Sequence, residues 1–236
     1  GVSYKNDTSL GYGDTAVPKV ASYARSGDYH VAVKEMLYET AARLGLKEDG
    51  TGFRAFTDTA PLLEKRLACE AGLGFIGRNT LLVSPRYGSF LLLGELVVDV
   101  PVDTYDRPYE GIGCGACRRC VEHCPAGALT GEGLDARRCI SRLTVEPHPE
   151  RVPALAQRIG ASTAGWIFGC DDCQNVCPYN LRAPFFANPR FRPLFSPADM
   201  PACRWLEMTQ AEFDARFGAT PMARSGLARI KELLRR

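Results

Sequence analysis

The sequence lacks the features that would place the protein in a membrane or mark it for export. None of its apolar runs approaches the roughly 20 residues that a membrane-spanning helix needs, and no signal peptide is visible. The formal net charge is only +2, so bulk charge alone does not make it a binder of polyanions. What remains is a globular chain of 236 residues, enough for one large core or two smaller ones.

Cysteine is the exception to this ordinary composition. Eight of the ten cysteines lie between positions 114 and 177, at short and regular spacings. Disulfide frameworks are typical of small secreted domains that lack a sufficient core. We therefore expect a cytoplasmic protein whose thiolates bind metal. Cys69 and Cys203 stand apart from the group, and each is predicted to be a small buried apolar residue.

The first cysteine run is 114-CGACRRCVEHCP-125, with the spacing C-x2-C-x2-C-x3-C-P. This is the spacing of bacterial ferredoxins, in which the first three cysteines bind one 4Fe–4S cluster and the fourth binds a second cluster. Zinc sites instead use pairs of C-x2-C units that are far apart. The spacing therefore favours iron–sulfur clusters over zinc.

The second run, 170-CDDCQNVCP-178, is one cysteine short of a full ferredoxin run, and Cys139 supplies the missing ligand. With the same exchange of ligands, the first cluster is predicted to be bound by Cys114, Cys117, Cys120 and Cys177. The second is predicted to be bound by Cys124, Cys139, Cys170 and Cys173. Clusters that exchange ligands lie close together, so this module predicts an electron path whose destination lies elsewhere in the chain.

Two helices are predicted before the cysteines. Residues 31–45 carry apolar side chains at helical spacing and end at a glycine. Residues 61–71 have proline in the first turn and are followed by Gly72, with Asp58 or Thr59 as the candidate cap.

Two strands, 79–84 and 89–98, are predicted after these helices, joined by a turn at 85–88. The continuous apolar character of the second strand predicts a central strand covered on both faces. Gly94 within it would allow a flat ligand to approach the backbone. The glycines of 72-GLGFIG-77 follow a helix rather than a strand, so they do not predict a dinucleotide-binding loop.

Asp58 has two readings from the sequence. It is either a simple helix cap, or a carboxylic acid held in an apolar wall. Burial in such a wall would raise the pKa of the carboxyl and keep it protonated as a proton donor. The wall would consist of Phe56, Leu62, Phe75 and Ile76.

The C-terminal segment is locally basic. Six basic residues stand against Glu232 alone, and they either bind phosphate or form a solvated helix face. They are Arg216, Arg224, Arg229, Lys231, Arg235 and Arg236. Thr209 and Glu212 have capping-box spacing before two phenylalanines, which predicts a docked helix.

Several separate motifs together resemble the epoxyqueuosine reductase family over about residues 15–225. They are FTDTAPLLEKRLA, AGLGFIGRNTLLVSPRYGSFLLLGEL, CGACRRCVEHCPAGAL, LDARRCISRLTVE and FGCDDCQNVCPYN. The start, GVSYKND, resembles the middle of the family's sequences, so we expect an N-terminal stretch to be missing. The resemblance implies an α+β fold with three parts. These are a nitroreductase-like cobalamin domain over 1–105, a ferredoxin-like two-cluster module over 106–182 and a helical segment over 183–236.

The resemblance also implies an activity: reduction of epoxyqueuosine to queuosine at the wobble position of a tRNA with a GUN anticodon. It implies cobalamin beside two 4Fe–4S clusters, an external flavodoxin- or ferredoxin-type electron donor, and a monomer with no membrane partner. A B12-binding D-x-H-x-x-G motif is half present, with Asp28 and His30 but Val33 in place of glycine. A base-off cobalamin without a protein histidine ligand is compatible with that.

Asp58 matches the family's proton donor in the motif F-x-D-T/S-A/G-P. The cofactor-binding residues expected from the resemblance are Asp58, Arg78, Asn79, Thr80, Leu82, Ser84, Ser141 and Asp171, although any of these could simply cap a turn. The candidates for tRNA phosphate contacts are the basic C-terminal segment together with Arg118, Arg119, Arg137, Arg138 and Arg142.

Three other functions stay open at this point. A plain two-cluster electron carrier explains only residues 110–180. A cobalamin-dependent reductive dehalogenase has the same cofactors, but such enzymes are usually exported and no twin-arginine leader is visible. A tRNA-binding or assembly protein with a structural cluster would have redox-inactive clusters.

Overall fold

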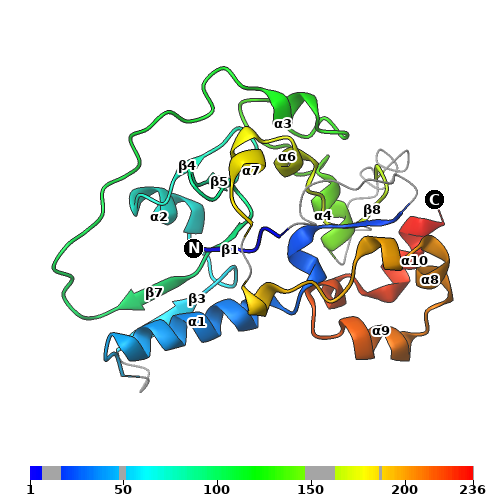
Figure 1. The fold of residues 1–236 in the computed structure, drawn as a ribbon, viewed down its shortest axis with the longest axis horizontal. Helices are drawn as coiled ribbons and strands as arrows, with labels where there is room; N and C mark the ends of the chain where they lie inside the picture. The colour runs from blue at the N-terminus through cyan, green and yellow to red at the C-terminus, as the bar shows by residue number, and fades with distance from the viewer. Residues whose placement is uncertain (7–16, 48–51, 147–162, 186–187, 236) are drawn as a thin grey trace.

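The computed structural model describes residues 1–6, 17–47, 52–146, 163–185 and 188–235. Its strands are short and pair two by two instead of forming one broad sheet (Figure 1). The antiparallel pairs are β1 (Val2–Ser3) with β6 (Leu91–Leu92), β3 (Phe53–Phe56) with β7 (Glu95–Val98), and β4 (Phe75–Ile76) with β5 (Leu82–Val83). The parallel pair is β2 (Lys19–Val20) with β8 (Trp166–Phe168).

The prediction of one long central strand over 89–98 is wrong. The apolar run is divided between β6 and β7, which pair with different partners, and Val97 is half exposed. Gly94 lies at the division. A Cβ atom there would stand 2.7 Å from Cγ1 of Val33 in the first helix, so the glycine admits a helix rather than a flat ligand.

The first helix, α1 (Tyr29–Arg43), agrees with the prediction to within two residues. Its N-terminus is capped by Asp28, whose side chain accepts a hydrogen bond from the backbone N–H of His30. It ends before Gly45, whose φ of +69° is a conformation that glycine adopts without strain.

The second helix, α2 (Glu64–Glu70), begins later than predicted, and its N-cap is Leu63 rather than Asp58 or Thr59. The cap interpretation of Asp58 is therefore wrong. The glycine loop follows α2 and leads into β4, so it does not connect a strand to a helix, as the sequence analysis concluded.

The cysteine module and the C-terminal segment are built from short helices. In the module these are α3 (Arg119–Glu122), α4 (Ile140–Val145), α6 (Asp172–Asn175) and α7 (Pro178–Arg182). The C-terminal helices are α8 (Ala202–Glu207), α9 (Gln210–Phe217) and α10 (Gly226–Leu234). The 3-10 turns are η1 (Ser22–Arg25), η3 (Pro189–Phe191), η4 (Pro197–Asp199) and η5 (Pro221–Arg224). None of the helices in the described ranges is long and apolar enough to cross a bilayer.

The largest hydrophobic core joins the C-terminal helices to β2 and β8. Trp205, Phe213 and Phe217 pack there with Val20 and Phe168, all with at most 1% of their surface exposed. The predicted capping box at the start of α9 is confirmed. The C-terminal segment therefore supports the strands that lead into the cysteine module.

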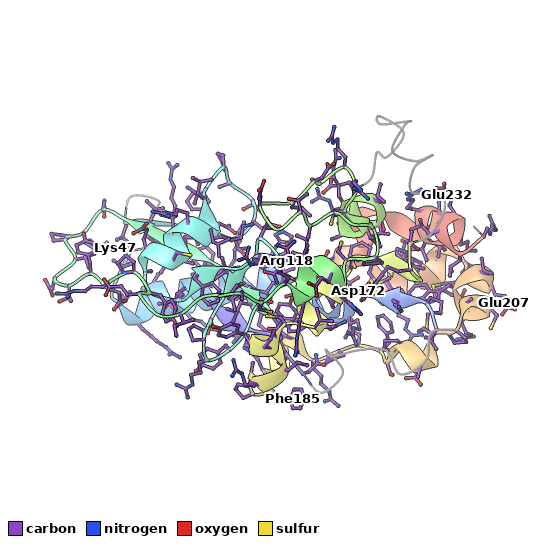
Figure 2. All side chains as sticks on the ribbon, turned by 90° about the horizontal axis from the view of Figure 1, so that it is seen from above. Lys47, Arg118, Asp172, Phe185, Glu207 and Glu232 are labelled. Carbon is purple, nitrogen blue, oxygen red and sulfur yellow. The ribbon has the colours of Figure 1, made fainter. Side chains whose placement is uncertain are left out.

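The molecule is elongated, and the module lies near its middle. Figure 2 shows Lys47 at one end, Glu207 toward the other, and Arg118 and Asp172 between them.

Candidate functional site

The structure groups the eight clustered cysteines into two sets. In the first set, the Cys120 thiol interacts electrostatically with those of Cys114, Cys117 and Cys177. These four cysteines line a small cavity of about 40 Å³. We call them the first quartet, and their role as ligands of the first cluster stays a prediction.

The second set adjoins the first. Cys173 interacts with Cys139 and Cys124, and also with Cys120 of the first quartet. We call Cys124, Cys139, Cys170 and Cys173 the second quartet. Burial raises the pKa of the Cys170 and Cys173 thiols, so their thiolate forms need nearby positive charge, which bound iron would supply.

The sulfurs of each quartet line a cavity wall instead of meeting at one point. Within the described ranges, no three His, Cys, Asp or Glu side chains lie close enough together to ligate a single metal ion.

The second quartet also lines a much larger cavity, of about 710 Å³. The other walls come from α2, β6 and the segments that precede α1 and β5. The lining is mainly apolar, with a few polar groups that converge on the space, which is typical of a cofactor or substrate pocket. Asp58, Asn79, Thr80, Ser141 and Asp171 are among the lining residues.

The remaining predicted cofactor residues lie elsewhere. Arg78 lines the small cavity of the first quartet, and its guanidinium donates to the carbonyls of Gly115 (3.1 Å) and Gly131 (3.3 Å). Leu82 is buried in β5, and Ser84 forms a β-bridge with Gly88. These three side chains therefore hold the walls together and do not line the larger cavity.

Asp171 ties the N-terminal part of the chain to the module. It is buried, and its carboxylate accepts hydrogen bonds from the Ser22 backbone N–H (2.7 Å) and from Nε2 of Gln174 (3.1 Å). Burial raises the pKa of Asp171, and these hydrogen bonds and the nearby Arg25 lower it again. The bonds fix the position of the loop that carries Cys170 and Cys173.

A second tie joins the module to the cavity wall. Asn180 in α7, three residues after Cys177, is fully buried. It accepts a hydrogen bond from the Ser89 backbone N–H (2.6 Å) and donates one to Ser89 Oγ (2.9 Å). Gly88 has no Cβ and φ +70°, so it leaves room for the Asn180 amide.

Asp58 does not lie in a buried apolar wall, which corrects the prediction. Its side chain is 66% exposed at the edge of the larger cavity, which Leu62 and Ile76 also line. Phe75 packs instead on Tyr109 and Tyr179. The Tyr29 hydroxyl donates to Asp58 Oδ2 (2.6 Å), and the Asp58 N–H donates to Glu64 Oε1 (2.5 Å). Its φ of +51° is uncommon outside glycine, and such strain clusters at functional sites.

Two neighbours of Asp58 were not found from the sequence. His30 Nε2 lies 3.9 Å from Asp58 Oδ2, and His30 Nδ1 lies 2.7 Å from Asp28 Oδ1. The Tyr29 ring stacks on His30 at 4.0 Å. The half-matched D-x-H motif was the signal: it marks the start of α1, from which Tyr29 and His30 reach Asp58.

The basic residues predicted to bind tRNA have different surroundings in the structure. Several are already neutralised by ion pairs: Arg137 with Asp135, Arg224 with Glu146, and Arg229 with Glu232. The Arg138 guanidinium lies over Gly127, close to Cys124 of the second quartet. Arg118 and Arg119 belong to the first quartet's surroundings, and Arg236 lies outside the described residues. The prediction that Cys203 is buried is wrong, because it is exposed, whereas Cys69 is partly buried.

Two adjoining cysteine quartets, one of which opens into a large cavity, define an iron–sulfur redox protein with two clusters. Residues 113–180 match the family model "4Fe-4S double cluster binding domain", and residues 1–59 match "Epoxyqueuosine reductase QueG, DUF1730". The chain belongs to the epoxyqueuosine reductase family.

Curated relatives and a solved structure support this assignment. The epoxyqueuosine reductase of Pseudomonas aeruginosa is 40% identical over 89% of this chain and 57% of its own length. That of Leadbetterella byssophila is 34% identical over 92% of this chain and 70% of its own length. An epoxyqueuosine reductase crystallised with an epoxyqueuosine-modified tRNA-Tyr stem loop superposes with a TM-score of 0.80 at 28% identity, over 99% of this chain and 61% of that one. The chain thus spans somewhat over half the length of several relatives.

Proposed function

We propose that this chain carries the reaction centre of an epoxyqueuosine reductase, which converts epoxyqueuosine to queuosine at the wobble position of a GUN-anticodon tRNA. The observation that supports this function is the larger cavity, which the second quartet and Asp58 line together. Electrons and a proton can therefore reach one enclosed space from two different parts of the fold.

The reaction itself needs both. Conversion of an epoxide to an alkene takes two electrons and two protons, breaks both C–O bonds, forms the C=C bond and releases the oxygen as water. The clusters pass electrons one at a time. Asp58 supplies a proton to the oxygen that leaves, as a general acid. Tyr29 and Glu64 hold Asp58 at the cavity edge, through its carboxylate and its backbone N–H.

We also propose cobalamin as the group that fills the larger cavity. A wide apolar cavity with converging polar side chains suits a large macrocycle, and Asn79, Thr80, Ser141 and Asp171 would hold its polar edge. When bound, cobalamin would supply a reducible cobalt centre beside the second quartet. The cluster of the second quartet is then the nearer to cobalt, and the first quartet receives electrons from outside.

The same proposal extends to the division of the chain into three parts. Residues 1–105 would form a nitroreductase-like part, 106–182 the ferredoxin-like module and 183–236 the helical segment. The protein would act as a cytoplasmic monomer supplied by a flavodoxin- or ferredoxin-type donor. Arg138, Arg142 and the C-terminal residues outside the ion pairs described above, Arg216, Lys231 and Arg235, would contact tRNA phosphates, and these contacts would weaken as salt rises.

Asp58→Asn tests the proposal directly. The variant keeps the shape of the side chain but cannot donate the proton. We expect full iron content and cofactor uptake, with turnover of an epoxyqueuosine stem loop reduced about 10²- to 10⁴-fold. Full turnover in this variant would show that Asp58 is not the acid. Asp99→Asn, an exposed carboxylate just after β7, is the matched control.

A further inference from the structure

The first quartet has surroundings unlike those of the second. Its small cavity is lined by Arg78 and Arg119 and by Pro178 and Tyr179. It shares only Asn79 with the lining of the larger cavity. The part of the surface next to the first quartet is therefore distinct from the opening through which a nucleoside would reach Asp58.

This surface carries unpaired positive charge. Arg118, Arg119 and Arg182 are exposed, and within the described ranges none of them forms an ion pair. The Arg118 guanidinium lies over Gly131, and that of Arg182 lies 5.5 Å from the centre of the Tyr179 ring. Glu122 in α3 and the exposed Glu110 and Glu132 offset part of this charge, but within the described ranges none of them forms an ion pair with these arginines.

The segments that border these arginines also expose apolar side chains. Ile112 is 83% exposed, and its carbonyl accepts a hydrogen bond from the Tyr179 hydroxyl (3.0 Å). Leu181 and Phe185, in and just after α7, are also more than half exposed. Exposed apolar residues among arginines are typical of protein interfaces, where arginine and aromatic residues are enriched.

We propose that this surface, formed by Arg118, Arg119, Ile112, Leu181 and Arg182, is the docking site of a small acidic electron-transfer protein. The inference rests on the proposed function, because it names the face through which that reaction receives its electrons. Each encounter oxidises the donor by one electron and reduces the first cluster by one, so two encounters serve one epoxide. Complementary charge steers such short-lived complexes, which have small interfaces.

The test is a charge reversal at two exposed positions on this surface that do not line the small cavity, Arg118→Glu with Arg182→Glu. The control, Arg43→Glu with Lys47→Glu, makes the same change in net charge at the far end of α1, where Figure 2 shows Lys47. Cluster-loaded protein is mixed anaerobically with a reduced flavodoxin, and the rate of cluster reduction is followed by absorbance. We expect the second-order rate constant to fall about tenfold or more in the test variant and to lose its salt dependence, with no such loss in the control.

Two further measurements make the result specific. Cluster reduction by photoreduced deazariboflavin, a small neutral donor, should proceed equally fast in both variants, which shows intact clusters. If the variant with Arg118→Glu binds less iron, Arg182→Gln alone should still slow reduction by flavodoxin about threefold, the rough effect of one rim charge. Equal flavodoxin rates in test and control proteins overturn the proposal.

The remaining outcome separates a protein partner from RNA. If electron uptake is unchanged while stem-loop affinity falls in the test variant, the surface binds tRNA and the proposal is wrong. The uptake measurement needs neither tRNA nor cobalamin. A protein that accepts electrons at this face but does not reduce epoxyqueuosine would contradict the proposed function alone.

Discussion

The two cysteine quartets differ in what surrounds them. The first adjoins a cavity of about 40 Å³ and an exposed group of arginines, whereas the second opens into a cavity of about 710 Å³ with mainly apolar walls. They meet where Cys120 and Cys173 interact. The two quartets thus have different surroundings, and under the proposed function this asymmetry would give electron flow between them a direction.

Removal of one second-quartet ligand should have the largest effect on this comparison. Cys139→Ser should reduce iron content from about eight to about four atoms per chain and abolish epoxyqueuosine turnover. The remaining first cluster should still accept electrons from flavodoxin. Iron analysis and absorbance measure this, with Cys203→Ser, an exposed cysteine on α8, as control. Eight irons and normal turnover would mean that Cys139 is not a ligand.

A smaller effect is expected on the side of the cavity that carries Asp58. Tyr29→Phe removes the hydroxyl that donates to Asp58 Oδ2. An intramolecular hydrogen bond contributes about 0.5–1.5 kcal/mol, so we expect kcat to fall roughly two- to tenfold while KM for the stem loop changes little.

Tyr38→Phe, on the same helix, is the control for this variant, because the Tyr38 ring packs on Phe53. Steady-state measurements of kcat and KM for both variants test this role of Tyr29. An equal response of the two variants, or a change confined to KM, would contradict a positioning role for Tyr29.

The smallest effect concerns pH. Burial and the neighbouring Glu64 raise the pKa of Glu95 to about 7. The folded protein then binds a proton that the unfolded chain has released, so stability should fall as pH rises from about 4.5 to 7. The slope should be well below the limit of about 1.4 kcal/mol per pH unit, since Glu95 stays partly open to water.

Thermal unfolding of cluster-loaded protein at pH 5.5 and 7.5 tests this, with Glu95→Gln beside the parent. The variant should lose part of the pH dependence. If the stability of both proteins changes identically with pH, the proton bound at Glu95 does not contribute to stability.

The cysteine module was predictable because its information is local. The short gaps between cysteines and the two prolines that follow the runs are enough to predict a two-cluster module, and residues 113–180 match that family model. The start of α9 was predictable for the same reason, since Thr209 and Glu212 satisfy each other.

The wall of the larger cavity was not predictable, because its structure depends on distant partners. Residues 89–98 form an uninterrupted apolar run, yet β1 pairs with one half and β3 with the other. Asp58 was placed in an apolar wall because its neighbours in sequence are apolar. Its partners are Tyr29 at the start of α1 and Glu64 at the start of α2, and its side chain is exposed at the cavity edge. Side-chain direction across tertiary contacts cannot be obtained from spacing alone.

The hydrogen bonds between Asn180 and Ser89 have a consequence for the assembly of the protein. Asn180 follows Cys177 by one helical turn and holds Ser89, which lines the larger cavity. Under the proposed function, iron at Cys177 would help to hold the helical turn from which Asn180 reaches Ser89. A single buried amide would then link insertion of the first cluster to completion of the cavity wall.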